Sequence, residues 1–402
     1  MRRYFLAIAV IFSSAVAHLV PPAAAAATTA TNLVLSTTDG QTRTGKHRNV
    51  STELFEDLEE LARLVDISYC VGTTGIYRPF RCLSHCSVFD GFELVTTWNT
   101  GPLLADSSGY IALSHPPFAK RIVVAFRGTY SLANTIVDLS AVPQAYVPYP
   151  ADGGEDDDDD EDTQKKRCTN CTVHAGFWTA WKNTRSIVLP SVAEARAKYP
   201  DYEIVLVGHS LGGAVAALAG LEMKLRGWSP RVTTFGEPRV GNLALAQFID
   251  EVFDLISDDG KEEDDDDNIA YRRVTHVNDP VPLLPLEEWG YRMHAGEIYI
   301  SKLDLPPSVS DLEHCDGDAD PRCIAGVDRS ESLALSVQDL RSSPQDSSPA
   351  EILKQQQQSG QLSAQWSLIP SRYRLWELLF AHRDYFWRIG LCVPGGDPGS
   401  WR

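Results

Sequence analysis

The pentapeptide Gly208-His209-Ser210-Leu211-Gly212 decides the fold, because its pattern G-x-S-x-G lies between an expected strand and an expected helix. Residues 203–207 form a short apolar, β-branched run that predicts a buried strand. Residues 213–219 contain no helix breaker before Gly220 and predict a packed helix. A sharp turn between the two holds the serine in an unusual backbone geometry and exposes its hydroxyl above a sheet. The flanking glycines remove side chains that would collide in this turn.

Ser210 is therefore the predicted nucleophile, and the alternative is a glycine-rich turn whose serine only caps a helix. A nucleophilic serine needs a base and an orienting acid. In enzymes whose serine lies on such a strand-to-helix turn, these residues follow in the chain order Ser, Asp or Glu, His. Of the histidines that follow Ser210, His382 falls late in the chain, where the final loop should carry the base. The other three, which we interpret as structural or surface residues, are His276, His294 and His314.

Asp279 is the predicted acid. It follows an expected strand over residues 271–277 and precedes Pro280 and Pro282, which stop further sheet pairing. It should therefore lie on a loop at the carboxyl end of a strand, where α/β enzymes gather their chemistry. The alternative is a plain Asp-Pro turn.

An oxyanion hole would complete the site. One expected donor is the backbone N–H of Leu211, the residue after the nucleophile. A second buried strand, residues 121–126, ends at Arg127-Gly128-Thr129, where a bend at the glycine can aim the Thr129 N–H at a developing oxyanion. The alternative is Thr129 as an ordinary turn residue.

Together these segments resemble the class 3 lipases, specifically the secreted filamentous-fungal triacylglycerol lipases. The resemblance implies an α/β-hydrolase fold, with a predominantly parallel central sheet flanked by helices and a short lid helix. It also implies a serine carboxylic-ester hydrolase that uses the triad and oxyanion donors named above on acylglycerols at a lipid–water interface. The matching segments are Ser68-Tyr69-Cys70, residues 124–129, 173–177, 208–213, 234–242, 277–282, 382–386 and 390–392.

By this resemblance the lid maps to residues 131–139. Its apolar stripe would face lipid, although an apolar stripe at helical spacing is more often core. Family lipases commonly carry a tryptophan where this chain has Thr135, which affects the expected interfacial behaviour rather than the chemistry. The stripe consists of Leu132, Ile136, Val137 and Leu139.

Eight cysteines, an even number, fit an oxidising destination. Three close pairs suggest small loop staples, and the resemblance supports a bond between the remaining two, Cys70 and Cys392. The C-x-x-C at 168–171 has no second half, so no metal site and no cofactor are expected. Glycosylation sequons occur at Asn49 and Asn170, the second of them between two cysteines. The close pairs are Cys82/Cys86, Cys168/Cys171 and Cys315/Cys323.

The predicted organisation is a signal peptide (1–17), a pro-segment or disordered region (18–49) and one lipase domain (50–395). The signal peptide predicts a secreted protein. Acidic insertions are expected at 152–165 and 257–268, and a disordered insertion at 326–365. No later segment reaches transmembrane length, and a monomer is expected.

The net charge of −18 comes mostly from the acidic insertions. Two runs in them hold 16 acidic residues and one lysine, so the rest of the chain is close to neutral. Nucleic-acid binding is therefore disfavoured.

Two other functions stay open. A feruloyl esterase or a phospholipase could use the same scaffold and the same triad. A non-catalytic binding protein with this fold is a more remote alternative, because the complete set of catalytic residue types argues against it.

Overall fold

An eight-stranded sheet forms the centre of the computed structural model, which describes residues 48–101, 106–129, 139, 146–148, 168–256, 266–326 and 380–394. Within these residues the strand order is β1-β2-β3-β6-β7-β9-β11-β12. The five strands from β3 to β11 in this order are parallel, and β1, β2 and β12 pair antiparallel at the two edges. The predicted α/β-hydrolase architecture with a mostly parallel sheet is confirmed.

The strands of this sheet are β1 (Phe92–Asn99), β2 (Ser108–Ser114), β3 (Arg121–Arg127), β6 (Glu203–His209), β7 (Pro230–Phe235), β9 (Tyr271–His276), β11 (Glu297–Ile300) and β12 (Leu312–His314). A smaller sheet contains β4 (Tyr146–Pro148), β5 (Thr172–His174), β8 (Gly241–Asn242) and β10 (Tyr291–Arg292). The α-helices are α1 (Thr52–Ile67), α3 (Ala175–Lys198), α4 (Leu211–Leu225) and α5 (Leu243–Phe253). Short 3-10 helices lie at Ser68–Cys70, His85–Val88, Asp266–Asn268, Val281–Leu283, Glu287–Trp289, Val309–Asp311 and Ile324–Gly326.

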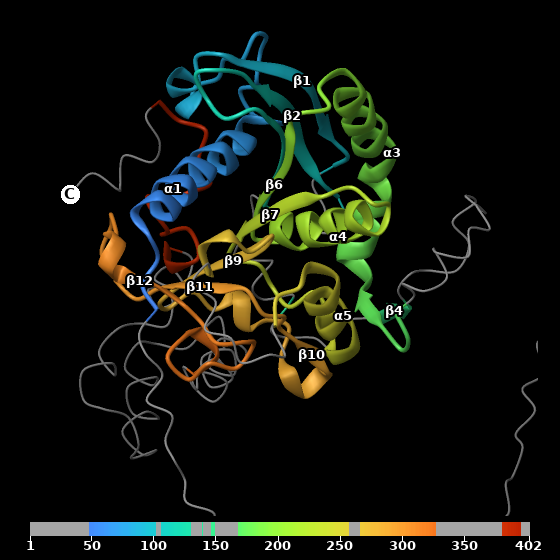
Figure 1. Ribbon diagram of the computed structural model, residues 1–402, viewed down its shortest axis with the longest axis vertical. Coiled ribbons are helices and arrows are strands. Elements are labelled where there is room, and N and C mark those ends of the chain that lie inside the picture. The colour runs from blue at the N-terminus through green and yellow to red at the C-terminus, as the bar shows by residue number, and fades with distance from the viewer. Residues whose placement is uncertain are drawn as a thin grey trace, which may run out of the picture. The chain divides into compact units, whose positions relative to one another are not determined.

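Helices cover both faces of the sheet, with α1 on one side and α3 and α4 on the other (Figure 1). The side chains of β3 alternate between the two cores that result. Val124 and Phe126 pack with α3 and α4, whereas Val123 and Ala125 pack with α1. Because both faces are buried, these strands are continuous apolar runs rather than alternating ones, as the sequence predicts.

Helix α4 is longer than predicted. The sequence predicts a packed helix up to residue 219, but the structure continues it through Gly220 to Leu225. A Cβ at Gly220 would lie 2.5 Å from the Cγ2 of Val232 in β7. The glycine is therefore a point of close helix–sheet approach and not a helix end.

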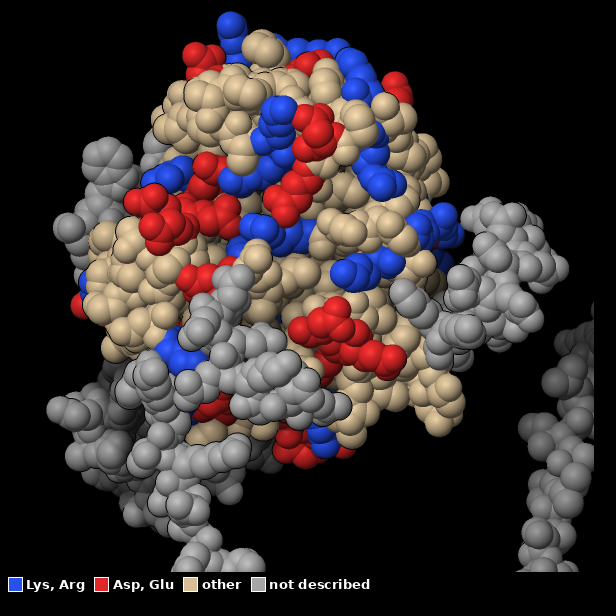
Figure 2. Space-filling model, in the orientation of Figure 1, with Lys and Arg blue, Asp and Glu red and all other residues tan. Residues whose placement is uncertain are grey.

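Charged side chains of both signs are interspersed over the described part of the face in Figure 2. Arg121 at the start of β3 pairs with Asp57 and Glu60 of α1, and Arg272 of β9 also pairs with Asp57. Lys120 pairs with Asp201 in the same way. This mixture of charges agrees with the sequence, in which the chain outside the two acidic runs is close to neutral.

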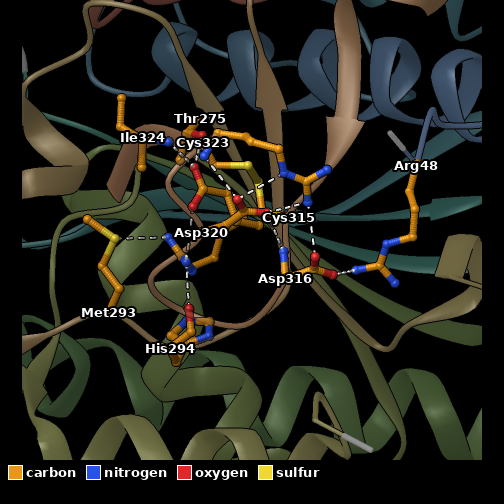
Figure 3. Close-up of a disulfide and its surroundings, with 12 residues drawn as sticks. Arg48, Thr275, Met293, His294, Cys315, Asp316, Asp320, Cys323 and Ile324 are labelled. Carbon is orange, nitrogen blue, oxygen red and sulfur yellow. Dashed lines mark hydrogen bonds and ion pairs between the residues drawn. A yellow bond between two sulfur atoms is a disulfide. The ribbon is translucent and has the colours of Figure 1, made fainter. Parts of the chain in front are cut away.

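Four disulfides join the cysteines in the expected pairs. Cys70 and Cys392 are 322 residues apart in the sequence, so their bond encloses almost the whole domain. The loop closed by Cys315 and Cys323 lies over the buried Glu297 carboxylate, which accepts hydrogen bonds from Thr275 and from the Ile324 N–H. Figure 3 shows this loop with its surrounding polar side chains.

Cys82 and Cys86 form the expected disulfide, but this bond packs against the hydrophobic core as well as closing a small loop. The spacing of 4 residues predicts no more than a staple across a small loop, whereas Cys86 is buried, with 3% of its surface exposed. It belongs to the core around α1, together with Phe80 and Phe89. The short loop is folded against this core, so the disulfide is a core contact as well as a loop staple.

The predicted signal peptide, pro-segment and insertions lie largely outside the described residues. So do the lid positions Leu132, Ile136 and Val137. Leu139 is described, and it is buried in the core that also contains Leu211. No helix in the described part of the chain has the length and apolar character to cross a bilayer.

Candidate active site

Ser210 connects β6 to α4 in a strained turn. Its φ of 58° and ψ of −130° lie where residues other than glycine are rare. The Ser210 N–H donates to the carbonyl oxygen of Phe235 at 2.9 Å, which ties the turn to the end of β7. A Cβ at Gly212 would lie 2.4 Å from the carbonyl oxygen of Phe126, so only glycine fits two residues after the serine. The elbow predicted from the pentapeptide is present.

The predicted base and acid lie together although 103 residues separate them. His382 Nδ1 is 3.0 Å from both Asp279 carboxylate oxygens, and neither side chain has exposed surface. Asp279 follows β9 and also accepts the Val281 N–H at 2.9 Å. Because the carboxylate accepts from Nδ1–H, the His382 Nε2 keeps its lone pair and can act as a base.

Tyr385 completes the surroundings of the acid. Its hydroxyl donates to Asp279 Oδ2 at 2.5 Å. Burial, and then the Asp279 carboxylate, raise the pKa of Tyr385 well above its ordinary value, so the hydroxyl stays protonated and remains a donor. In the sequence, Tyr385 lies within the matching segment 382–386. Its position three residues after His382 was the available signal.

Three polar atoms of the predicted site are buried without a hydrogen-bond partner in the described part of the chain. Among the described residues, the buried Ser210 Oγ, His382 Nε2 and Thr129 Oγ1 make no hydrogen bond. Buried polar atoms without partners are costly, and here they belong to the predicted nucleophile, to the predicted base and to Thr129, whose backbone N–H is a predicted oxyanion donor. Ser210 and His382 are not hydrogen-bonded to each other, and in many enzymes this contact tightens only in the Michaelis complex.

The two residues of the predicted oxyanion hole line one small cavity. It has a volume of about 10 Å³, the room of a single water molecule, and both Thr129 and Leu211 line it together with Arg127. The Leu211 N–H is the first of α4 and has no partner within the helix. A residue at a helix N-terminus and a residue beyond a strand end thus line the same space, as the predicted oxyanion hole requires.

One expectation about the serine is wrong. The pentapeptide predicts an exposed hydroxyl, whereas Ser210 has no exposed surface. The chain that leaves β3 passes over it, since a Cβ at Gly128 would lie 2.9 Å from the Ser210 Cβ.

Of the three other histidines that follow Ser210, two contact carboxylates and one contacts an aromatic ring. His294 Nε2 is 3.2 Å from Glu237. The His294 carbonyl oxygen accepts from Arg273 at 2.5 Å, and Figure 3 draws this contact at His294. His314 Nε2 is 2.8 Å from Asp267. The buried His276 ring lies beside the Tyr385 ring at 6.0 Å between centroids, and burial lowers the pKa of His276.

Both sequons are exposed at their asparagines. Asn49 forms an isolated bridge to Glu313, and Asn170 lies in the loop between Cys168 and Cys171 with a φ of 60°. Exposure is a requirement for modification and not a sign of it, so glycosylation stays a prediction.

An enzyme built in this way transfers acyl groups through a serine, so fold and site together define the chain as a serine hydrolase with the α/β-hydrolase fold. Residues 123–289 match the family "Lipase (class 3)". The chain is 53% identical over 369 residues to "Secreted mono- and diacylglycerol lipase 2" of Gibberella zeae, an alignment that covers 88% of this chain and 86% of the relative. It therefore belongs to the class 3 lipases.

Other relatives and solved structures agree. "Lipase A" of Sodiomyces alcalophilus is 52% identical over 369 residues, which is 88% of this chain and 85% of the relative. The crystal structure of the Lip2 lipase from Yarrowia lipolytica superposes with a TM-score of 0.64 at 28% identity, covering 87% of this chain and 98% of that one. The family expected from the motifs is confirmed.

Proposed function

We propose that this class 3 lipase is secreted and hydrolyses acylglycerols, with Ser210, Asp279 and His382 as its catalytic groups. The observation that carries the proposal is the buried Asp279–His382 pair, whose free Nε2 accompanies a buried serine on a strained elbow. The Gibberella zeae relative is named for mono- and diacylglycerols. We infer that these partial glycerides are substrates alongside the triacylglycerols that the sequence predicts.

In the proposed mechanism, His382 Nε2 takes the proton of Ser210 Oγ as this oxygen attacks the ester carbonyl. Asp279 holds the imidazole in the required tautomer and stabilises the imidazolium. The N–H groups of Leu211 and Thr129 donate to the oxyanion of the tetrahedral intermediate, where each such donor contributes about 3 kcal/mol. The imidazolium then protonates the leaving glycerol oxygen, and water releases the fatty acid from the serine by the same steps.

A substrate panel tests the function. We expect the purified protein to hydrolyse emulsified monoolein, diolein and triolein, with the ranking among them giving its glyceride preference. Methyl ferulate and phosphatidylcholine test the feruloyl esterase and phospholipase alternatives. Faster turnover of either one than of every glyceride would overturn the proposal.

Fluorophosphonate labelling separates catalysis from mere binding. A lipase should incorporate one probe per molecule, whereas a Ser210→Ala variant should incorporate none. A wild-type protein that binds glyceride but takes up no probe would support the non-catalytic alternative.

Secretion rests on the names of the relatives and on the predicted signal peptide. Four disulfides in the structure also suit an oxidising compartment. N-terminal sequencing of protein recovered from culture medium should find that residues 1–17 are absent, together with part or all of 18–49 if that region is a removed pro-segment. Detection of the protein only inside cells would contradict secretion.

A further inference from the structure

His209, the second residue of the pentapeptide, lies against the proposed base. Its ring stacks on the His382 ring, with centroids 4.6 Å apart and an angle of 27° between the planes. His209 Nε2 is 2.8 Å from the backbone carbonyl oxygen of His382. On its other side, His209 Nδ1 is 2.6 Å from the hydroxyl of Tyr69. All three residues are buried.

These partners determine the tautomer of His209. A backbone carbonyl can only accept, so Nε2 must carry the proton and donate to His382. Nδ1 then has a lone pair, and the Tyr69 hydroxyl must donate to it. Burial raises the pKa of Tyr69 well above its ordinary value, so this hydroxyl keeps its proton. Tyr69 thus selects the one form of His209 that can hold the base.

The ring of His209 also stays neutral. Burial, and then the charge that His382 can carry, lower the pKa of His209 well below its ordinary value. A neutral ring adds no positive charge beside His382 when that residue becomes an imidazolium. Nδ1 consequently remains an acceptor for Tyr69 throughout the reaction.

The contact completes the attachment of the base. Asp279 holds the imidazole of His382 by its Nδ1, and His209 holds the main chain of the same residue. The Tyr69 hydroxyl also packs against Gly128, which directly precedes Thr129, because a Cβ at Gly128 would lie 2.4 Å from the Tyr69 oxygen. The chain of contacts therefore runs from the oxyanion strand, through Tyr69 and His209, to the base.

We propose that Tyr69 and His209 are positioning residues, which hold the main chain of His382 in place for proton transfer from Ser210. Neither touches the substrate or the reacting atoms in this role. The proposal rests on the assignment of His382 as the base. Displacing a base by even 1 Å can lower the rate about 100-fold. Because neither residue touches the substrate, loss of either one should lower kcat and leave KM unchanged.

The first test compares Tyr69→Phe, His209→Leu and His209→Gln with the wild type on p-nitrophenyl butyrate, a soluble ester. Fluorophosphonate titration counts the active sites, so kcat refers only to folded enzyme. We expect Tyr69→Phe to lower kcat about tenfold and His209→Leu about 100-fold, both with KM unchanged. His209→Gln should recover most of the loss, because its amide N–H can reach the same carbonyl.

Tyr110→Phe is the matched control. Tyr110 is equally buried and donates from its hydroxyl to the carbonyl oxygen of Leu64, away from the proposed site. The control and Tyr69→Phe should lose similar thermal stability, but only Tyr69→Phe should lose kcat. If both variants keep wild-type kcat, or if both lose it equally, the positioning role is wrong.

A double variant tests the tautomer argument itself. A glutamine amide has no tautomer to select, so Tyr69→Phe should cost less than about twofold in the His209→Gln background instead of about tenfold. An undiminished tenfold loss there would show that Tyr69 acts in another way. A wrong assignment of His382 as the base would give a different result from a wrong positioning role. In that case His382→Ala would retain activity, whether or not Tyr69 and His209 are also replaced.

Discussion

At the residue scale, the site depends on single side chains held in costly states. Ser210 occupies a positive-φ backbone conformation that costs about 1–3 kcal/mol, and its buried hydroxyl has no partner among the residues that the structure describes. His382 is also buried, and within the described ranges its Nε2 makes no hydrogen bond. Such costs persist only where the surrounding structure compensates for them, and here the hydrogen bonds of Asp279 and Phe235 do so.

The triad assignment predicts a graded loss of activity. Ser210→Ala and His382→Ala should each lower kcat by several orders of magnitude, and Asp279→Asn by somewhat less. His314→Gln is the control, because His314 lies on the edge strand β12 and pairs with Asp267, so its replacement should leave kcat unchanged. Turnover of a short-chain ester measures each variant. An active His382→Ala enzyme beside a folded but inactive His294→Ala enzyme would move the base to His294.

Tyr385 supports the acid, and its removal should be measurable. Tyr385→Phe deletes the donor to Asp279 Oδ2 without changing the ring, so we expect kcat to fall about tenfold with little change in KM. Tyr271→Phe removes a comparable buried hydroxyl that donates to Glu237 instead. Equal kcat in the two variants would assign Tyr385 a purely structural role.

At the element scale, helix ends carry much of the local specificity. Ser51 Oγ accepts the Leu54 N–H at the start of α1, and Asn242 does the same for Leu245 at the start of α5. Helix α3 has a less usual cap, because His174 Nδ1 accepts the N–H groups of Gly176 and Phe177. This cap works only while Nδ1 is unprotonated.

The cap of α3 predicts a dependence of stability on pH. Burial lowers the pKa of His174 from 6.5 to about 4, so the unfolded chain binds a proton that the folded chain excludes between these values. The stabilisation is complete above pH 6.5 and is lost as the pH falls toward 4. Between pH 7 and pH 5 this residue should remove about 2 kcal/mol from the free energy of unfolding.

His174→Asn provides the comparison, because asparagine caps helices well and does not titrate. Urea unfolding at about pH 7 and about pH 5 should show a smaller loss in this variant than in the wild type. His85, whose pKa burial also lowers to about 4, adds the same slope to both proteins. Identical losses in the two proteins would exclude His174 as a source of the dependence.

At the scale of the whole molecule, contacts between distant segments assemble the site. The elbow follows β6, the acid follows β9, and the base belongs to the segment 380–394 near the end of the described chain. That segment is anchored by the Cys70–Cys392 disulfide and by Asp66, which accepts the Gly390 N–H at 2.8 Å. The base thus depends on residues at the opposite end of the domain.

The long-range disulfide should contribute more stability than a local one. In the chain-entropy view, a bond that closes a loop of 322 residues restricts the unfolded chain far more than one that spans 4 residues. We expect the Cys70→Ser/Cys392→Ser variant to lose about 2–5 kcal/mol of unfolding free energy. Urea unfolding measures this loss.

The Cys82→Ser/Cys86→Ser variant is the control for this prediction and should lose less. The two pairs are matched in burial, because Cys70 and Cys86 are buried whereas Cys392 and Cys82 are each partly exposed. The cost of placing a serine hydroxyl in the core is therefore similar in both variants, and the difference between them reports loop length. A larger loss in the control would contradict the expectation.

The sequence by itself determined the features that depend on local patterns. The run before Ser210, the glycines around it and the prolines after Asp279 restrict nearby backbone and side chains, so strand, elbow and acid loop could all be predicted. Continuous apolar runs such as residues 121–126 predicted buried strands, and the resemblance to class 3 lipases implied that the sheet is mostly parallel. The chain order typical of this fold class sufficed to select His382 by its late position.

Only the tertiary structure decided what surrounds these residues. Four such features depend on contacts between segments that are far apart in the sequence or on different elements. They are the close approach of Gly128 to Ser210, the extension of α4 past Gly220, and the contacts of His209 and of Tyr385. A local pattern does not specify them, because they arise when strand order and helix packing bring separate backbones within a few ångströms. The proposed positioning of the base by His209 and Tyr69 depends on that packing, with 140 residues between the ring and the hydroxyl that selects its tautomer.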